Sequence, residues 1–485
     1  MAQSNSISRM ALKAVGLFGG VQVAGILCAI IRTKLVALLI GPVGVGLFSL
    51  FNQAMETINT ASGLGIRQSS VRDLSLAQEQ GQESLIARMV AAVRRWSLWL
   101  GLLGATLTLM LAPQLSQWTF GNDSQVWGFI VLSIAILLVT LTNGEYAILQ
   151  GMAQLKRLAH VTIWGSVFGL VVSIPLFYYL RENSILPSII AYASGNALFA
   201  YLFRHRNYTS TKSNMSDSWQ LGKGFVKLGI YMTIGNFVTI LAGYAFNAWL
   251  NMNVSTHEVG LYQAGYTLVY KYTGLILTAL GMEYYPRLSK VIHSKIRLQA
   301  YVSQEINIVM MLMAPVAGLF MIFRELIVWL LYTSDFYAIT TFASWIMVGT
   351  IFRALSWCIA FVILAKGDGK IYLITESLSA VVELVINITF YQHWGLNGLG
   401  FSFVVWYIVY TAIVWVVYRR TYGLKLIPSC LLNMAWALAV SLLTLAAVQL
   451  RWQAVAIAIA TTSLIVCVMQ LKRQFWGHKP NRQSN

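Results

Sequence analysis

Charged residues are scarce in this sequence. Only 10% of its 485 residues are Asp, Glu, Lys or Arg, whereas 58% are hydrophobic, and the mean hydropathy is +0.67. A soluble globular domain has about a quarter of its residues charged, so this composition excludes one. Apolar runs of about 20 residues recur along the chain, and only helices satisfy the backbone of such runs in lipid. We therefore expect an all-α polytopic membrane protein.

Cysteine and short catalytic motifs are also scarce. Cys28, Cys358, Cys430 and Cys467 all fall inside apolar segments without C-x-x-C spacing, which indicates neither a disulfide framework nor a zinc site. The sequence contains no G-x-x-x-x-G-K-[ST] loop, no G-x-S-x-G elbow and no D-x-D pair. These absences argue against an ATPase, a hydrolase of that type and a metal-dependent glycosyltransferase. We expect no cofactor, no metal and no enzymatic activity.

The apolar runs predict fourteen transmembrane helices. Their expected limits are 11–34, 44–66, 90–112, 126–147, 160–180, 185–203, 228–250, 260–282, 306–324, 339–365, 371–391, 398–418, 429–449 and 453–471. The first run continues past Cys28 without a convincing cleavage site, so we interpret it as a retained helix rather than a signal peptide.

Lys and Arg are distributed unevenly between the two sides of these helices. The net charge of +18 would ordinarily suggest a nucleic-acid partner, but the basic residues gather in alternate loops. With the N-terminus on side one, that side holds 27 of the 34 Lys and Arg residues and side two holds 5. The positive-inside rule then places both termini in the cytoplasm and argues against a nucleic-acid partner.

Two short echoes indicate an internal duplication. The stretch Val45-Gly46-Leu47-Phe48 returns as Val259-Gly260-Leu261-Tyr262 after 214 residues, and the turn 151–153 is echoed by 367–369 after 216. An even number of helices in each copy makes the copies a parallel repeat. We expect a six-helix N-terminal lobe (1–206), a cytoplasmic linker (207–227), a six-helix C-terminal lobe (228–420), and two further helices with a basic tail (421–485).

Seven of the charged side chains inside the expected helices are candidates for a functional role. They are Arg32, Lys34, Glu56, Lys271, Arg353, Glu376 and Glu383. A charge at the bilayer centre costs about 2.5–3.5 kcal/mol, so each must be paired or must face water inside the protein. Glu376 and Glu383 are seven residues apart and therefore share one helix face.

Two interpretations of these charges stay open. In the structural one, Glu56 pairs with Lys271 and Arg353 pairs with a glutamate, while Arg32 and Lys34 extend to the membrane interface. In the functional one, the cations line a wet cavity suited to a diphosphate or an acidic sugar, where Arg binds bidentately and Lys acts as a point charge. Neighbouring tyrosines either stack on sugars or pack helices together: Tyr262, Tyr266, Tyr270 and Tyr272.

Several motifs, taken in order, carry a family resemblance. They are Gly41-Pro42-Val43-Gly44-Val45-Gly46-Leu47-Phe48 with Asn52-Gln53, then Val259-Gly260-Leu261-Tyr262-Gln263-Ala264, Tyr285-Pro286-Arg287-Leu288-Ser289, and Leu330-Leu331-Tyr332-Thr333-Ser334-Asp335-Phe336. Together with fourteen spans they resemble the Wzx polysaccharide flippases of the multidrug/oligosaccharidyl-lipid/polysaccharide exporter superfamily, among them the O-antigen and enterobacterial common antigen translocases. The likeness runs from about Ser8 to Arg420.

The resemblance implies two six-helix lobes with a cavity between them and alternating access. The cargo would be an oligosaccharide repeat unit on undecaprenyl diphosphate, moved from the cytoplasmic to the periplasmic leaflet of a bacterial inner membrane. Partners would be the lipid bilayer, a polysaccharide polymerase and a chain-length regulator. By position in the helices, substrate binding falls to Arg32, Lys34, Lys271 and Arg353. The acids Glu56, Glu376 and Glu383 either pair with cations in one state or couple transport to a proton or sodium ion.

Two alternative functions make different demands on the sequence. An ion-coupled small-molecule exporter of the related MATE branch shares the architecture, but export of cationic drugs favours a net acidic cavity, and here the central cations at least match the acids. A polysaccharide polymerase or sugar transferase would need a sizeable loop or an acidic pair at one membrane face. The outer loops, such as 251–259 and 392–397, are too short for this.

Overall fold

The computed structural model describes residues 25, 27–204 and 215–476. Secondary structure in this part of the chain is helical throughout, and it contains no strand. Of the first expected span, 11–34, only the end is described, and residues 27–39 are helical. The all-α fold class expected from the apolar runs is confirmed.

The chain forms two compact units. Unit 1 comprises Met1–Gly260 with Leu331–Thr333, and unit 2 comprises Leu261–Leu330 with Ser334–Asn485. Helix α9 (Met215–Asn253), which the repeat assigns to the second lobe, packs in unit 1 against α2 (Gly41–Gly63) and α4 (Glu83–Met110). The lobe limits expected from the sequence, 1–206 and 228–420, stay a prediction.

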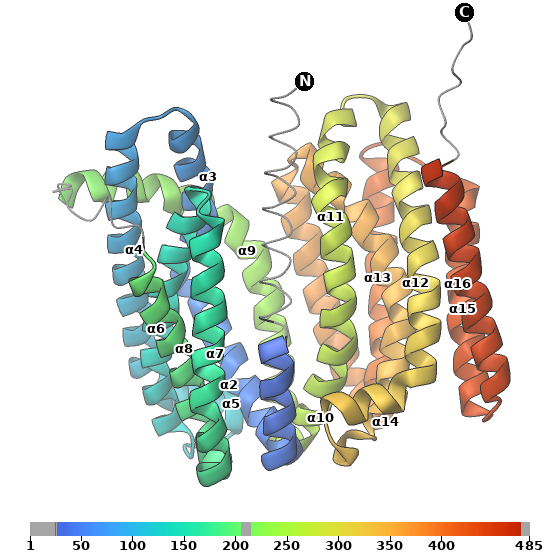
Figure 1. The fold of residues 1–485 in the computed structure, drawn as a ribbon, viewed down its shortest axis with the longest axis horizontal. Helices are drawn as coiled ribbons and strands as arrows, with labels where there is room; N and C mark the ends of the chain where they lie inside the picture. The colour runs from blue at the N-terminus through green and yellow to red at the C-terminus, as the bar shows by residue number, and fades with distance from the viewer. Residues whose placement is uncertain (1–24, 26, 205–214, 477–485) are drawn as a thin grey trace, which may run out of the picture. The chain divides into compact units, whose positions relative to one another are not determined.

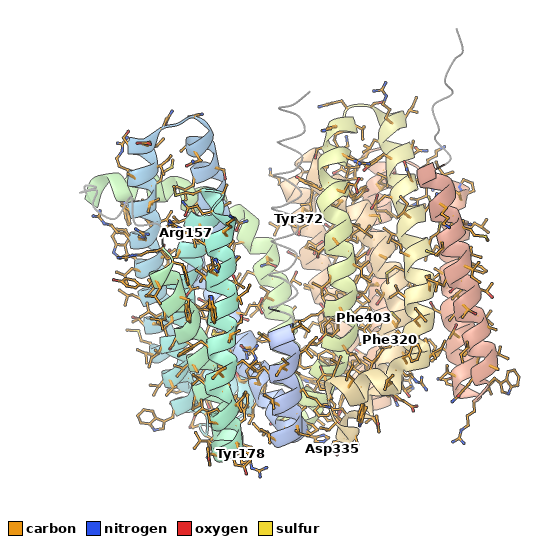
Figure 2. All side chains as sticks on the ribbon, viewed as in Figure 1. Arg157, Tyr178, Phe320, Asp335, Tyr372 and Phe403 are labelled. Carbon is orange, nitrogen blue, oxygen red and sulfur yellow. The ribbon has the colours of Figure 1, made fainter. Side chains whose placement is uncertain are left out.

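Unit 1 also contains α3 (Ile66–Glu79), α5 (Ala112–Phe120), α6 (Val126–Gly151), α7 (Leu155–Leu180), the short η1 (Arg181–Ser184) and α8 (Ile185–Leu202). Helix α6 lies beside α4 and α8, and α8 lies beside α7 (Figure 1). Arg157 and Tyr178 lie at opposite ends of α7 (Figure 2). The chain bends by 68° between α4 and α5, because Pro113 at the start of α5 cannot continue the hydrogen-bond ladder.

Unit 2 contains the long apolar helices of the second half. They are α11 (Tyr272–Val291), α12 (Lys295–Leu331), α13 (Ile339–Lys366), α14 (Gly369–Arg420), α15 (Pro428–Gln449) and α16 (Gln453–Trp476), with the short η4 (Ser334–Phe336) before α13. Helix α13 is central, because it packs against α11, α14 and α15, and α15 pairs with α16 (Figure 1). The π-helix η3 (Thr267–Lys271) joins α10 (Thr256–Tyr266) to α11.

Each expected span from the second onward coincides with a helix in the described part of the chain. The eleventh and twelfth spans are the two halves of α14, which are separated by a turn at Gly395, whose φ of 60° and ψ of −148° suit only glycine. Seven described helices are long and apolar enough to cross a membrane unaided, or eight when the bent pair α4–α5 is counted. Polar residues lower the hydropathy of α2, and η3 interrupts the α10–α11 span. The expected number of about fourteen helices is consistent with this arrangement.

The glycines of the repeated motif lie against each other. A Cβ atom added to Gly46 would lie 2.1 Å from the carbonyl oxygen of Thr256, and one added to Gly260 would lie 1.9 Å from that of Pro42. Each of these Cβ atoms would also lie 3.1 Å from the backbone nitrogen of the other glycine. Equivalent residues of the two copies therefore meet at a backbone contact that leaves no room for a side chain.

Candidate functional site

Arg32 lies between two aromatic rings of unit 1. Its guanidinium carbon is 4.9 Å from the ring centre of Phe48 on α2 and 4.6 Å from that of Tyr192 on α8. A weakly hydrated, planar guanidinium is well suited to stacking of this kind. The Nε atom of Arg32 is buried and has no hydrogen-bond partner among the described residues. The rings of Phe48 and Tyr192 therefore contact the Arg32 guanidinium, while its Nε makes no hydrogen bond with a described residue.

Lys34, on the same helical segment as Arg32, is bound to backbone. Its Nζ donates a hydrogen bond to the carbonyl oxygen of Tyr332. Tyr332 follows α12 in sequence but belongs to unit 1. The side chain of Lys34 is half-buried. Lys34 is thus engaged with the protein in this conformation.

The polar residues of α2 divide into a packed set and an exposed acid. The amide of Asn247 on α9 donates to the side-chain oxygen of Gln53 at 2.8 Å, and the Thr57 hydroxyl donates to the Gln53 carbonyl at 2.8 Å. Glu56, between them in sequence, is exposed. At the depth expected from the sequence, an ionised Glu56 is more stable facing water inside the protein than facing lipid.

Arg353 on α13 is the most closely held of the predicted cations. Its guanidinium carbon lies 3.6 Å from the ring centre of Tyr270. Its Nη1 donates to the Tyr270 carbonyl oxygen at 2.8 Å and to the Thr273 hydroxyl at 3.2 Å. Among the described residues, Arg353 forms no ion pair with Glu376 or Glu383. The predicted structural pairing of Arg353 with a glutamate is therefore not what the structure shows.

Lys271 is the last residue of η3, next to Tyr270, and its side chain is exposed. A π-helix widens the helix by one residue in a turn and is often found at functional sites. In unit 2 the structure therefore brings the two predicted cations to a single feature, because Lys271 ends the π-helix and Arg353 binds its backbone. Arg32 and Lys34 belong to unit 1.

The predicted acids of α14 lie on a polar seam between its two halves. Tyr410 donates a hydrogen bond to Glu376 Oε1, and two further pairs cross the seam: Trp406 Nε1 to Ser379 Oγ at 2.9 Å, and Ser402 Oγ to Asn387 Oδ1 at 2.6 Å. Glu383 lies between these pairs in sequence and is only 7% exposed. Glu376 and Glu383 share this seam, as their spacing predicts.

The tyrosines after Gly260 pack mainly against one another. The ring centres of Tyr266 and Tyr270 are 4.6 Å apart and stacked, and Tyr262 lies 5.6 Å from Tyr266. Phe403 on α14 presents an edge-to-face contact to Tyr270 at 6.2 Å, and Figure 2 marks its place in unit 2. Tyr262 is buried. This arrangement favours the packing interpretation for Tyr262, whereas Tyr270 has an additional role as the ring beneath Arg353.

Three further charged residues make contacts that their positions in the sequence do not predict. Arg94 and Glu145 form a bidentate ion pair between α4 and α6, with Nε to Oε1 at 2.6 Å and Nη2 to Oε2 at 3.1 Å. Arg324, expected at the outer helix end, is only 9% exposed and donates to Ser344 Oγ at 3.1 Å. Glu145 lies inside the expected span 126–147, so its presence among apolar residues was the available signal. No group of three or more potential metal ligands occurs among the described residues.

One family model and two named proteins are similar to this chain in sequence. The family model described as "Polysaccharide biosynthesis protein" matches residues 35–341. The chain is 22% identical over 403 residues to proteins named lipid III flippase from Escherichia coli (strain K12) and from Shigella flexneri, a match that covers 80% of this chain and 94% of each relative.

Solved structures show the same fold. The lipid II flippase MurJ in an inward closed conformation superimposes with a TM-score of 0.70 at 11% identity, covering 96% of this chain and 99% of MurJ. An inward-facing MATE family multidrug transporter of the MOP superfamily gives 0.67 at 16% identity, covering 84% of this chain and 94% of that one. These structural similarities show the fold. The family model spans more than half of the sequence and therefore shows the family. This multi-pass membrane protein has the fold of the MOP superfamily transporters and belongs to the polysaccharide biosynthesis protein family.

Proposed function

We propose that this protein is a flippase that moves a lipid-linked oligosaccharide across a membrane by alternating access. The observation that supports the proposal is the environment of Arg353 on α13. Its guanidinium contacts the Tyr270 ring and donates hydrogen bonds to the oxygens of Tyr270 and Thr273, and not to an acid. A cation without an acid partner attracts an anionic headgroup. The family and the lipid III flippase relatives support the same class of cargo.

The lipid carrier in this proposal is undecaprenyl diphosphate, and the glycan is an O-antigen or a related surface polysaccharide repeat unit. Arg32, Lys34, Lys271 and Arg353 bind the anionic cargo in successive states of the cycle. They offset the loss of water that a diphosphate and sugar hydroxyls suffer on leaving the cytoplasmic leaflet. The acyl tail stays in lipid.

Glu56, Glu376 and Glu383 are proposed to couple or gate the transport cycle. Glu376 is bound by Tyr410, and Glu383 is buried within the seam of α14, so a change in protonation or ion occupancy would alter contacts inside unit 2. A gradient of protons or sodium ions then biases the equilibrium between the two access states, as a ligand biases any two-state protein.

The proposed location is the bacterial inner membrane, with both termini in the cytoplasm, because Lys and Arg gather on that side. Cargo would pass to a polysaccharide polymerase and its chain-length regulator on the periplasmic side. No chemical step belongs to the protein itself. The two lobes 1–206 and 228–420 are proposed as the moving parts of the cycle.

An ion-coupled exporter of small molecules is the second candidate. The observation that favours it is the fold shared with MATE transporters. Its substrates would be cationic in that case, and deletion of the gene would sensitise cells to such compounds without affecting surface polysaccharide.

The deciding experiment is deletion of the gene in its host, followed by analysis of surface polysaccharide and of lipid-linked intermediates in each leaflet. We expect loss of the polymer and accumulation of undecaprenyl-linked repeat units on the cytoplasmic side, and the trapped sugar identifies the substrate. Restoration by the wild-type gene is the control. Normal polymer in a strain without a functional paralogue would reject the flippase in favour of the exporter.

A further inference from the structure

Helix α2 has a packed face and an open face. Its buried side chains recur at helical spacing along the packed face, at Leu50, Ala54 and Thr57. The open face, opposite, carries polar or small residues at the same spacing: Asn52, Glu56, Asn59 and Gly63. Glu56 is exposed, and a Cβ atom added to Gly63 would have nothing within 4 Å. Because α2 lies in an expected membrane span, polar residues on this face indicate that it borders water inside the protein.

Glu56 has no partner in the part of the chain that the structure describes. It forms neither an ion pair nor a hydrogen bond with a described residue. Thr57, next to it on the packed face, instead bonds within the helix to the Gln53 carbonyl. An ionised carboxylate accepts about four hydrogen bonds. The acceptor capacity of Glu56 is therefore available to a ligand.

Asn52 and Asn59 lie on either side of Glu56 along the open face. The Nδ2 atom of Asn52 donates to the Phe48 carbonyl at 2.7 Å, and no described residue donates to its side-chain oxygen. Thr140 on α6 donates to Asn59 Oδ1 at 2.7 Å, and no described residue accepts from the Asn59 amide nitrogen. The open face of α2 therefore presents acceptors at residues 52 and 56 and a donor at residue 59.

This mixture of donors and acceptors decides which class of ligand fits. A metal cation is bound by oxygen ligands alone, and no group of three or more potential metal ligands occurs among the described residues. An anion is bound by donors, and the carboxylate of Glu56 would repel it. A hydroxyl group both donates and accepts hydrogen bonds. The hydroxyls of a sugar therefore match the open face of α2 better than either kind of ion.

The open face of α2 continues towards Arg32. Phe48 precedes Asn52 by one helical turn, and the Arg32 guanidinium carbon lies 4.9 Å from the centre of the Phe48 ring. In the proposed function Arg32 binds the anionic part of the cargo. The first sugar of such a lipid is bonded directly to its diphosphate, so a sugar subsite has to adjoin the subsite for the anion. The order Arg32, Asn52, Glu56 meets this requirement.

We infer that Asn52, Glu56 and Asn59 form a subsite for the sugar hydroxyls of the cargo. This inference rests on the proposed function and specifies the part of Glu56 in it, because Glu56 then gates the cycle by binding the glycan and not by binding an ion. Sugar hydroxyls lose water when the cargo leaves the cytoplasmic leaflet, and hydrogen bonds to the open face of α2 replace that water. All three side chains touch the substrate in this subsite.

The test is lipid binding by purified full-length protein in detergent, with two probes. One is the undecaprenyl-linked repeat unit extracted from the deletion strain. The other is undecaprenyl diphosphate, which has the same anion and tail without the sugar. We expect wild-type protein to bind the first probe about tenfold more tightly, the effect of one hydrogen bond to a charged group. Glu56→Ala should bind both probes alike, and Asn52→Ala should reduce the preference to about threefold.

Glu56→Gln separates hydrogen bonding from charge. It has the same charge as Glu56→Ala but keeps an acceptor oxygen, so it should retain most of the preference for the sugar-bearing probe. Glu83→Ala is the matched control, because Glu83 is an exposed acid in the first turn of α4, outside the expected spans. It should bind both probes as wild type does. Thermal unfolding of every variant separates lost binding from lost fold.

Wild-type protein that binds both probes equally would overturn the inference, as would a folded Glu56→Ala variant that keeps the preference. A loss in Glu56→Gln as complete as in Glu56→Ala would also overturn it, because the charge and not the acceptor oxygen would then matter. In these cases the intermediates trapped in the deletion strain still support the flippase. A deletion strain with normal polymer and no trapped intermediate rejects the proposed function itself.

Discussion

The second helix of each copy of the repeat contains the same motif and then differs between the copies. Near their starts, α2 and α10 both contain Val-Gly-Leu followed by an aromatic residue, and Gly46 and Gly260 lie in contact. α2 then continues as a regular helix to Gly63, whereas the second copy widens into η3, which corresponds to residues 53–57 at the offset of 214. The shared glycine motif determines where the copies meet. The π-helix η3 occurs only in the second copy, where the Tyr270 carbonyl accepts a hydrogen bond from Arg353.

Of the features that the two copies share, the contact between Gly46 and Gly260 should be the most sensitive to substitution. Gly46→Ala or Gly260→Ala would place a methyl group within 2.1 Å of a backbone oxygen, which cannot move aside as a side chain can. We expect a loss of about 3 kcal/mol or more, seen as loss of folded protein in fluorescence-detected size exclusion. Gly63→Ala on α2, where nothing lies within 4 Å, is the control and should be neutral or stabilising. Normal folding of both contact variants would show that the helices do not meet there.

Substitution of Arg353 tests the contact with η3, which distinguishes the second copy from the first. Arg353→Ala should reduce surface polysaccharide by roughly tenfold or more at normal protein level, because the charge and its hydrogen bonds are lost. Arg353→Lys should retain part of the activity, since it keeps the charge without the planar fork. Polysaccharide would be quantified against protein level on an immunoblot. Lys370→Ala, at an exposed position of α14, serves as control, and wild-type polymer with Arg353→Ala would contradict the proposed role.

The turn 151–153 and its counterpart 367–369 also differ between the copies. Asp368 in the turn 367–369 accepts a hydrogen bond from Tyr422 at 2.6 Å, whereas the first copy has Met152 at that point. Burial, together with this bond, raises the pKa of Tyr422. Because the pKa is higher in the folded than in the unfolded state, the stabilisation is complete below about pH 10 and declines as pH rises towards the folded value.

Tyr422→Phe should therefore lower stability by about 1 kcal/mol near neutral pH, the typical contribution of one hydrogen bond. The difference in melting temperature between the variant and wild type should stay constant at neutral pH and narrow above about pH 10. Thermal unfolding in detergent over a pH series measures this. A difference that widened at high pH would mean that the phenolate, not the phenol, is the stabilised form.

The smallest effect is expected from Thr57→Val on α2. The Thr57 hydroxyl bonds within its own helix, to the Gln53 carbonyl, and such a bond adds little to a helix that is already complete. Stability should change by less than about 0.5 kcal/mol. A large effect of Thr57→Val on transport would mean that the Thr57 hydroxyl does more than bond within its own helix.

The helices could be predicted from the sequence because lipid imposes one requirement on every span. Runs of apolar residues long enough to cross the bilayer had to be helical, and the described helices follow them. The bend before α5, the π-helix η3 and the turn at Gly395 arise from local backbone conformation, which hydropathy does not report. Gly395 lies in an expected loop whose length was consistent with a sharp turn, but its φ and ψ were not predictable.

The candidate site could be predicted only as a set of residues. Burial cost identified Arg353 and Glu383 as unusual, and the helical period placed Glu376 and Glu383 on one seam. The partners of Arg353 are a backbone carbonyl and a hydroxyl 83 and 80 residues away. A charge pattern does not show such partners, so the sequence could offer only an acid as the structural partner of Arg353.

The single-glycine turn of α14 also bears on how the chain is inserted during synthesis. Gly395 joins two long helical halves, and the returning half carries the partners of the first: Ser402 for Asn387, Trp406 for Ser379 and Tyr410 for Glu376. The first half alone would carry the carboxyl of Glu383 into lipid at a cost of about 2.5–3.5 kcal/mol. We expect the two halves to leave the translocon together as a helical hairpin, so that these polar groups are already covered when they first meet the bilayer.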